Sequence, residues 1–179
     1  MDYQQIIKFW FTDITPAQWW EKDTDFDQML SNRFGEIHQQ VVQCELCHWR
    51  ESALGRLAEI IVIDQFSRNI YRDNPMAFLH DPLAVALAQE AIAIGADYDL
   101  SESQRNFMYM PFMHSESLIV HHQAQALFAD KASDSTYQFE LKHLAIIERF
   151  GRYPHRNSIL QRKSTNEELA FLEQQGSSF

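Results

Sequence analysis

The sequence predicts an all-α protein, built as a stack of antiparallel helical hairpins or as a bundle. Only 5 Gly and 5 Pro occur in 179 residues, and no low-complexity linker divides them. The one β-branched run, Ile60 to Ile63, continues into Asp64 without a turn residue, so we expect helix there and not strand. Helix-start signals recur along the chain, at Thr15-Pro16-Ala17-Gln18, Asp81-Pro82, Ser101-Glu102-Ser103-Gln104 and Thr165-Asn166-Glu167-Glu168.

These signals, and the apolar spacing between them, give the expected helices. Pro111 is expected to end or kink the helix before it, and Gly151 to stop the helix before it. A chain of this length suits one hydrophobic core, which predicts a single helical domain over residues 1–179. The helices are predicted at 2–11, 16–21, 24–47, 53–71, 75–80, 82–95, 102–110, 115–131, 137–150 and 166–175.

The charge balance limits the partners of the protein. A formal net charge of −10 opposes binding to nucleic acid or anionic membrane, so neither is expected as a partner. No stretch approaches the roughly 20 apolar residues of a membrane span. The N-terminus MDYQQIIKFWFTDI lacks the basic and apolar regions of an export signal, which predicts a cytoplasmic protein. In a reducing compartment, Cys44 and Cys47 are not expected to form a structural disulfide.

Several short motifs predict neither a cofactor nor a metal. CELCH, residues Cys44 to His48, has the pattern of c-type haem attachment, but that chemistry needs an exported protein. A zinc site needs further ligands, and the sequence has no second cysteine pair. His114, His121 and His122 do not form the H-E-x-x-H pattern, and no phosphate-binding or nucleophile-elbow motif occurs.

The stretch LAEIIVIDQFSRNIYR, residues 57–72, carries charge on an apolar helical face. At about 100° per residue, Asp64, Arg68 and Arg72 share the face of Leu57 and Ile61. The opposite side is apolar as well, so the charged residues are not simply the solvated face. Asp64 and Arg68 can form a surface ion pair, brace neighbouring helices or belong to a ligand site, and these alternatives stay open.

A second candidate region is FELKHLAIIERFGRYPHRN, residues 139–157. His143 shares a helical face with Phe139, Ile147 and Phe150, so it points to the core or to a cleft. From Arg149 to Asn166 the chain has no acidic residue. It carries instead Arg149, Arg152, Arg156, Arg162 and Lys163. These cations can clamp a carboxylate or phosphate, or they can neutralise acidic surface elsewhere in the fold.

The third region is YMPFMHSES, residues 109–117. Pro111 lies in an apolar run that is followed by His114 and Glu116. Because proline frees backbone groups beside these polar side chains, the segment suits a pocket wall. It suits equally a corner between helices that is capped by Ser115.

Five motifs together resemble one family. FWF near the start, DQFSRNIYR, YMPFMHSE, RFGRYPHRN and STNEELAFL are similar to the bacterial DUF924 family, whose function is unknown and whose fold is TPR-like. The resemblance implies a stack of helical hairpins and brings no activity. Gln161 stands where the family pattern would have glycine. The residues that match the pattern are Asp64, Gln65, Arg68, Asn69, Arg72, Tyr109, His114, Glu116, Arg152, His155, Arg156 and Asn157.

These observations lead to one hypothesis and two alternatives. The hypothesis is a concave groove in which Arg68, Arg72, Arg152 and Arg156 receive an anionic small molecule or a peptide terminus, and Asp64, Asn69 and Asn157 hold the arginines. One alternative is an enzyme, perhaps a hydrolase, in which His114 or His143 acts as a base with Glu116 or Asp64. The other alternative is an interaction scaffold whose polar residues are structural. The sequence does not indicate an oligomeric state.

Overall fold

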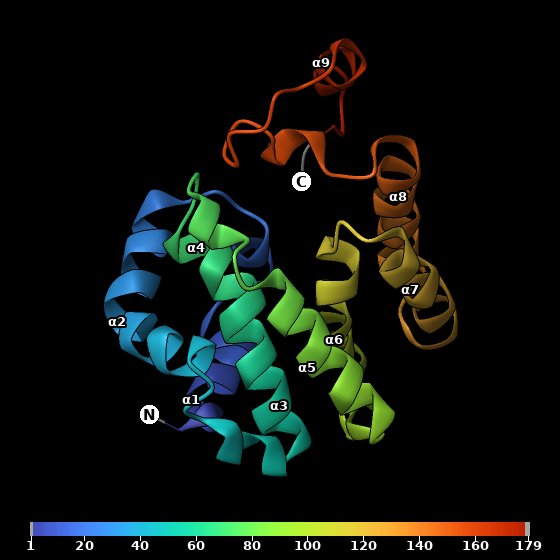
Figure 1. Cartoon of the computed structure of the whole chain (residues 1–179). Coiled ribbons are helices and arrows are strands. Elements are labelled where there is room, and N and C mark those ends of the chain that lie inside the picture. Colours follow the sequence, from blue (N-terminus) through green and yellow to red (C-terminus); the bar gives the residue numbers. More distant parts are fainter. Residues whose placement is uncertain (1, 178–179) are drawn as a thin grey trace. The chain divides into compact units, whose positions relative to one another are not determined.

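The computed structural model describes residues 2–177, and these form helices and turns without a strand (Figure 1). The all-α prediction is therefore confirmed. The first part of the chain contains α1 (Tyr3–Lys8), η1 (Phe9–Asp13), η2 (Pro16–Trp19), α2 (Thr24–Val42), η3 (Cys47–Glu51), α3 (Ala53–Ile61), η4 (Val62–Phe66), α4 (Ser67–Ile70), η5 (Pro75–Ala77) and α5 (Asp81–Ala93). The rest contains η6 (Ala96–Asp99), α6 (Glu102–His114), α7 (Leu118–Lys131), α8 (Asp134–Phe150), η7 (Pro154–Arg156) and α9 (Asn166–Leu172).

The contacts of the chain gather in two compact units. The N-terminal unit contains the chain up to Arg72 together with Met76–Pro111. The C-terminal unit contains Asp73–Pro75 and the chain from Phe112 onward. The single domain over 1–179 and its TPR-like stacking stay predictions. No helix among residues 2–177 is long and apolar enough to cross a membrane.

Aromatic side chains fill the core of the N-terminal unit. Phe9 and Trp10 begin the π-helical segment η1, and both are buried. The ring of Phe9 lies 4.8 Å from that of Phe34, which lies 5.1 Å from Phe66. Trp10 meets Phe107 edge-on at 5.6 Å. Such ring pairs add about 0.5–1.5 kcal/mol each to the free energy of burial, so they tie α2, η4 and α6 to the N-terminal segment.

The polar stretch of the sequence analysis lies on a helix that changes its winding. The helix predicted at 53–71 is found as α3, a π-helical turn η4 and α4 in direct succession. Ser52 caps its start by accepting a hydrogen bond from the Gly55 amide at 3.1 Å. The π-helical turn contains Asp64 and Gln65, and π-helical turns occur often at functional sites. The sequence predicted the helix but not this turn.

Two predicted helix ends are wrong. Helix α2 ends at Val42, and the chain turns at Cys44 instead of continuing to residue 47. Helix α6 passes Pro111 and continues to His114, so the end predicted at residue 110 is wrong, while the alternative of a kink at the proline stays a prediction. Proline removes one helical hydrogen bond and its ring crowds the carbonyl four residues earlier, and α6 tolerates both effects. The boundary between the two units falls directly after Pro111.

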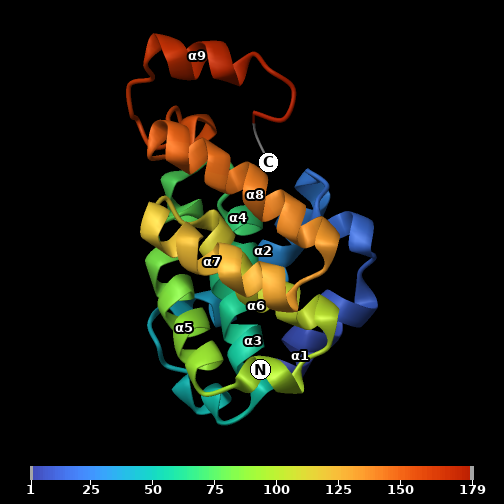
Figure 2. The same ribbon diagram turned by 90° about the vertical axis from the view of Figure 1, so that its right-hand side faces the viewer.

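A helical hairpin organises the C-terminal unit. Helices α7 and α8 lie side by side in both views (Figures 1 and 2), joined by Ala132 and Ser133. Ser133 caps α8 by accepting a hydrogen bond from the Thr136 amide at 3.3 Å, so the helix begins three residues before its predicted start. Gly151 ends α8 with φ +68°, as the sequence predicted.

Candidate functional site

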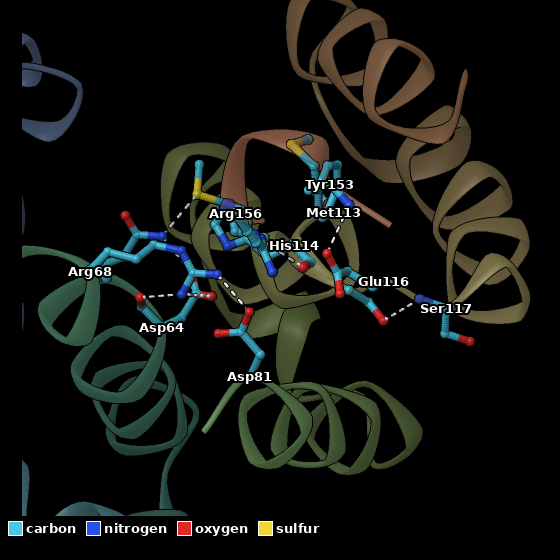
Figure 3. A network of polar contacts seen from close by, with 12 residues as sticks. Asp64, Arg68, Asp81, Met113, His114, Glu116, Ser117, Tyr153 and Arg156 are labelled. Carbon is cyan, nitrogen blue, oxygen red and sulfur yellow. Dashed lines mark hydrogen bonds and ion pairs between the residues drawn. The ribbon is translucent and has the colours of Figure 1, made fainter. Parts of the chain in front are cut away.

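A buried polar centre in the N-terminal unit is built around Asp64, which is 1% exposed (Figure 3). The Arg68 guanidinium lies 3.1 Å from the Asp64 carboxylate and donates to the Asp64 main-chain carbonyl at 2.7 Å. Its other terminal nitrogen donates to Asp81 at 3.0 Å. The side-chain amide of Gln65 donates to the second oxygen of the Asp64 carboxylate at 2.5 Å. One guanidinium therefore binds two carboxylates of the chain itself.

The next turn of the same helix carries a second ion pair. Arg72 donates to both carboxylate oxygens of Asp27 on α2, at 2.5 and 2.7 Å. The Asn69 side chain accepts a third hydrogen bond from Arg72 at 3.0 Å and donates to the Gln65 carbonyl at 3.0 Å. Two-point pairing with Asp27 is the strong form of an arginine–carboxylate contact, and it ties this helix to α2.

Tyr109 has a different partner from the arginines. Its hydroxyl donates to Asp97 at 2.6 Å, and both residues are fully buried. Burial, together with the neighbouring carboxylate, raises the pKa of Tyr109 well above its usual range. The tyrosine is therefore a neutral hydrogen-bond donor that fixes α6 to η6.

A polar centre in the C-terminal unit is built around Glu116. Arg162 donates to both of its carboxylate oxygens, at 2.6 and 2.9 Å, and the Tyr153 amide donates to it at 2.7 Å. Burial favours the neutral form of Glu116, but the hydrogen bonds from Arg162 and Tyr153 outweigh it and lower the pKa of this carboxyl. Glu116 is therefore a carboxylate at neutral pH.

Arg156 belongs to the same centre and is 5% exposed (Figure 3). Its guanidinium donates to the His114 carbonyl at 3.0 Å and lies 4.6 Å from the centre of the Tyr153 ring. The centre of the His155 ring lies 5.5 Å from the centre of the Tyr153 ring. Asn157 accepts a hydrogen bond from the Arg162 guanidinium at 2.9 Å. Stacking on an aromatic ring fixes the plane of the guanidinium group.

The remaining arginines of the acid-free run contact glutamates that follow it in sequence. Arg152 donates to both carboxylate oxygens of Glu168, at 2.6 and 2.8 Å, and to the Lys163 carbonyl at 3.0 Å. Arg152 thereby lowers the pKa of Glu168 to about 2. Arg149 contacts Glu167 at 2.8 Å. With the Glu116 pair, three of the five cations in the run neutralise acidic side chains, which is one of the two expected alternatives.

His143 lies in the interior of the C-terminal unit, 5% exposed. Its Nδ1 lies 2.7 Å from the Phe139 carbonyl, so this nitrogen carries the proton and donates. Burial lowers the pKa of His143 to about 3, against the effect of that hydrogen bond. The ring is therefore neutral at pH 7 and meets the Tyr153 ring edge-on at 5.8 Å.

The sequence analysis missed a histidine–glutamate pair in this unit. His121 and Glu140 are both fully buried, and Nδ1 of His121 lies 2.7 Å from the Glu140 carboxyl. The Nε2 atom of His121 donates to the Ser115 carbonyl at 2.8 Å and lies 3.2 Å from the Tyr153 hydroxyl, which donates to the Met113 carbonyl at 2.5 Å. Burial raises the pKa of Glu140, against the effect of His121.

The helical spacing that singled out His143 also marks these two residues. His121 shares a face of α7 with Ala124 and Phe128, which are buried. Glu140 shares a face of α8 with Leu144 and Ile147, which are buried too. A search for polar residues on apolar faces across both helices would therefore have found the pair.

The predicted binding residues thus form two groups, one in each unit. The N-terminal group contains Asp64, Gln65, Arg68, Asn69 and Arg72, and Tyr109 lies against Asp97 instead. In the C-terminal unit Arg152 lies against Glu168, while the group around Glu116 contains His114, Glu116, His155, Arg156 and Asn157. No set of three or more histidine, cysteine or acidic side chains in residues 2–177 is arranged to hold a metal ion.

These features define a class of protein, an all-α chain with an arginine–carboxylate centre in each of two compact units, buried at Asp64 and half-buried at Glu116. The chain belongs to the family described as bacterial protein of unknown function (DUF924), which matches residues 6–176. A solved structure of a protein of unknown function from Agrobacterium tumefaciens is similar, with 38% sequence identity, a TM-score of 0.90 and 96% of each chain covered. No match was found among curated proteins.

Proposed function

We propose that the C-terminal unit binds an anionic group at Arg156, namely a carboxylate or phosphate of a small molecule or of a peptide terminus. The observation that carries this proposal is the fixed orientation of the guanidinium group. It is held by the His114 carbonyl on one side and by the Tyr153 ring on its face. A guanidinium with a fixed plane loses little freedom when its N–H groups bind a pair of oxygen atoms.

The local charge supports the same site. Arg156 and Arg162 both act on Glu116, so two cations lie near one carboxylate. His155 and His114 belong to the same centre, and the run from Arg149 to Asn166 contributes no acidic side chain. An incoming carboxylate or phosphate meets a positive potential there.

In this proposal the other predicted arginines stabilise the fold and do not bind the ligand. Arg68, Arg72 and Arg152 contact carboxylates of Asp64, Asp27 and Glu168, and each of these contacts lies within one unit. Arg156 is the residue whose guanidinium the His114 carbonyl and the Tyr153 ring orient, so it is the first to test.

The test is isothermal titration with two probes, inorganic phosphate and N-acetylglycine, of which the second carries the carboxylate of a peptide terminus. We expect one of them to bind the wild type and to bind at least tenfold more weakly to Arg156→Gln, because a charge-assisted contact is lost. Arg149→Gln is the control, since it removes an exposed guanidinium from the same unit. Equal affinity in Arg156→Gln, or no heat from either probe, would overturn the proposal.

The enzyme alternative has weaker support. A general base works best with a pKa near the working pH, whereas the pKa of His143 is lowered to about 3. The hydrogen bonds that Glu116 accepts come from Arg162 and the Tyr153 amide, and both hold it as a structural carboxylate. The pair with histidine–carboxylate geometry, His121 and Glu140, is fully buried.

A further inference from the structure

The end of α2 has an unusual residue at its turn. Cys44 has φ +59°, in the left-handed region where glycine is normally found. Its amide donates to the Val41 carbonyl at 2.9 Å, and the Glu45 amide donates to the Gln40 carbonyl at 3.0 Å. These two hydrogen bonds form a Schellman motif with Cys44 at the glycine position. A side chain costs about 1–2 kcal/mol in this conformation, so Cys44 stands at a position that favours glycine.

A second cysteine follows three residues later. Cys47 begins η3, and only Glu45 and Leu46 separate it from Cys44. Both thiols are exposed and free. The two cysteines thus have the Cys-x-x-Cys spacing that is found in redox-active pairs.

A fixed positive charge lies beside the first thiol. Arg50 donates to both carboxylate oxygens of Glu59, at 2.7 and 2.6 Å, and Glu59 is 1% exposed. The Cys44 side chain is a further interaction partner of this guanidinium. Arg50 is therefore held by Glu59 next to the exposed Cys44 side chain.

We propose that Cys44 and Cys47 form a reversible redox pair, oxidised by a hydroperoxide to an intramolecular disulfide and reduced again by a low-molecular-weight thiol. The site lies in the N-terminal unit and is independent of the anion site at Arg156. Metal binding by the same pair has no support, because no third ligand joins it among residues 2–177.

The oxidation takes place in two steps. The Cys44 thiolate attacks one oxygen of hydrogen peroxide, the O–O bond breaks, and with one proton taken up the products are a sulfenic acid on Cys44 and water. The Cys47 thiol then attacks the sulfenic sulfur, the S–O bond breaks, and the hydroxyl leaves as water with the thiol proton. Two thiols and one peroxide thus give one disulfide and two waters. Two molecules of glutathione return both thiols and are themselves oxidised to a disulfide.

The test uses the full chain, treated with hydrogen peroxide and then digested with trypsin. Both cysteines lie in one expected peptide, residues 34–50, so an internal disulfide appears as a loss of two hydrogen masses from that peptide. We expect this loss in the wild type and its reversal by reduced glutathione. In Cys47→Ser, we expect dimedone to trap a sulfenic acid on Cys44. Cys44→Ser should give neither product.

Three results would overturn the proposal. They are a peptide whose mass does not change, disulfide-linked dimers in place of the internal bond, and oxidation of both thiols to sulfinic acids. Each of them is read from mass, so a small change in the stability of a variant does not affect the conclusion. Cys44→Gly provides a further control, because it keeps the left-handed turn and removes the first thiol.

Discussion

Glu116 and Arg162 form a two-point ion pair although 46 residues separate them in sequence, with N–O distances of 2.6 and 2.9 Å. The Tyr153 amide donates to the same carboxylate, and Arg162 also donates to the Tyr153 carbonyl at 3.1 Å. The pair therefore connects the corner after α6 to both sides of η7. Glu116, which the sequence marked for ligand binding, therefore helps to hold the η7 segment that contains Arg156.

We predict that Glu116→Gln lowers the free energy of unfolding by about 1–3 kcal/mol, because the guanidinium loses its charged partner. Urea unfolding followed by far-ultraviolet circular dichroism measures the loss, since all four tryptophans lie in the N-terminal unit. The pKa of Glu116 is lowered, so its contribution is present above about pH 4.5 and is lost as the pH falls through the folded-state value. Glu148→Gln changes an exposed glutamate of α8 and should have little effect. Equal losses in both variants would contradict the prediction.

Arg68→Ala tests the bracing of the N-terminal unit. The substitution removes the guanidinium from Asp64, which is 1% exposed, and from Asp81. We expect a loss of about 3–5 kcal/mol in the free energy of unfolding, as for other broken buried pairs. Tryptophan fluorescence during urea unfolding reports on this unit.

The matched control for this variant is Arg56→Ala. Arg56 is paired with Glu90, whose side chain is 51% exposed, and such pairs contribute about 0–1 kcal/mol. If Arg68→Ala and Arg56→Ala destabilise the unit equally, the buried centre is not a brace.

His143 makes the stability of the C-terminal unit depend on pH. Its pKa is about 3 in the folded chain and near 6.5 in the unfolded chain, so between these values the unfolded state binds more protons. Stability should then fall as the pH drops below 6.5, by up to about 1.4 kcal/mol per pH unit. The carboxyl groups with lowered pKa, Glu116 and Glu168, contribute to this loss only below about pH 4.5.

We predict that His143→Gln reduces this slope between pH 6.5 and 4.5, and that His122→Gln, an exposed change on α7, preserves it. Circular dichroism melts at half-unit steps of pH measure the slope. A slope that is the same in wild type and His143→Gln would show that other groups produce it.

The sequence predicted the fold class and much of the helix order because capping residues act locally. Thr165 and Glu168 form their capping box, and Gly151 ends α8. The π-helical turns at η1 and η4 were not predictable, because one wider turn shifts an apolar pattern too little to be recognised. The end of α2 was missed since Cys44 gives no sign of a left-handed conformation.

The candidate sites were predictable as lists of residues but not as sets of partners. The sequence marked Arg72 and Arg152 as charged residues in unusual places. Their partners, Asp27 and Glu168, lie 45 and 16 residues away. A single sequence carries no signal for such pairing, because the folded chain alone decides which carboxylate meets which guanidinium.

Gln161 gives a prediction in which the resemblance to the family and the backbone geometry agree. It has φ +54°, and around it the Arg162 amide donates to the Asn157 carbonyl at 2.8 Å and the Gln161 amide to the Ser158 carbonyl at 3.2 Å. This is the Schellman pattern, in which glycine is usual, and the resemblance to the family implies glycine at this position too. We predict that Gln161→Gly raises the free energy of unfolding by about 1 kcal/mol, because relief of the left-handed strain exceeds the added entropy of the unfolded chain. Gln161→Ala keeps a β-carbon in the same conformation and should give no gain in circular dichroism melts. A loss of stability in Gln161→Gly would mean that the exposed glutamine side chain contributes more than its backbone conformation costs.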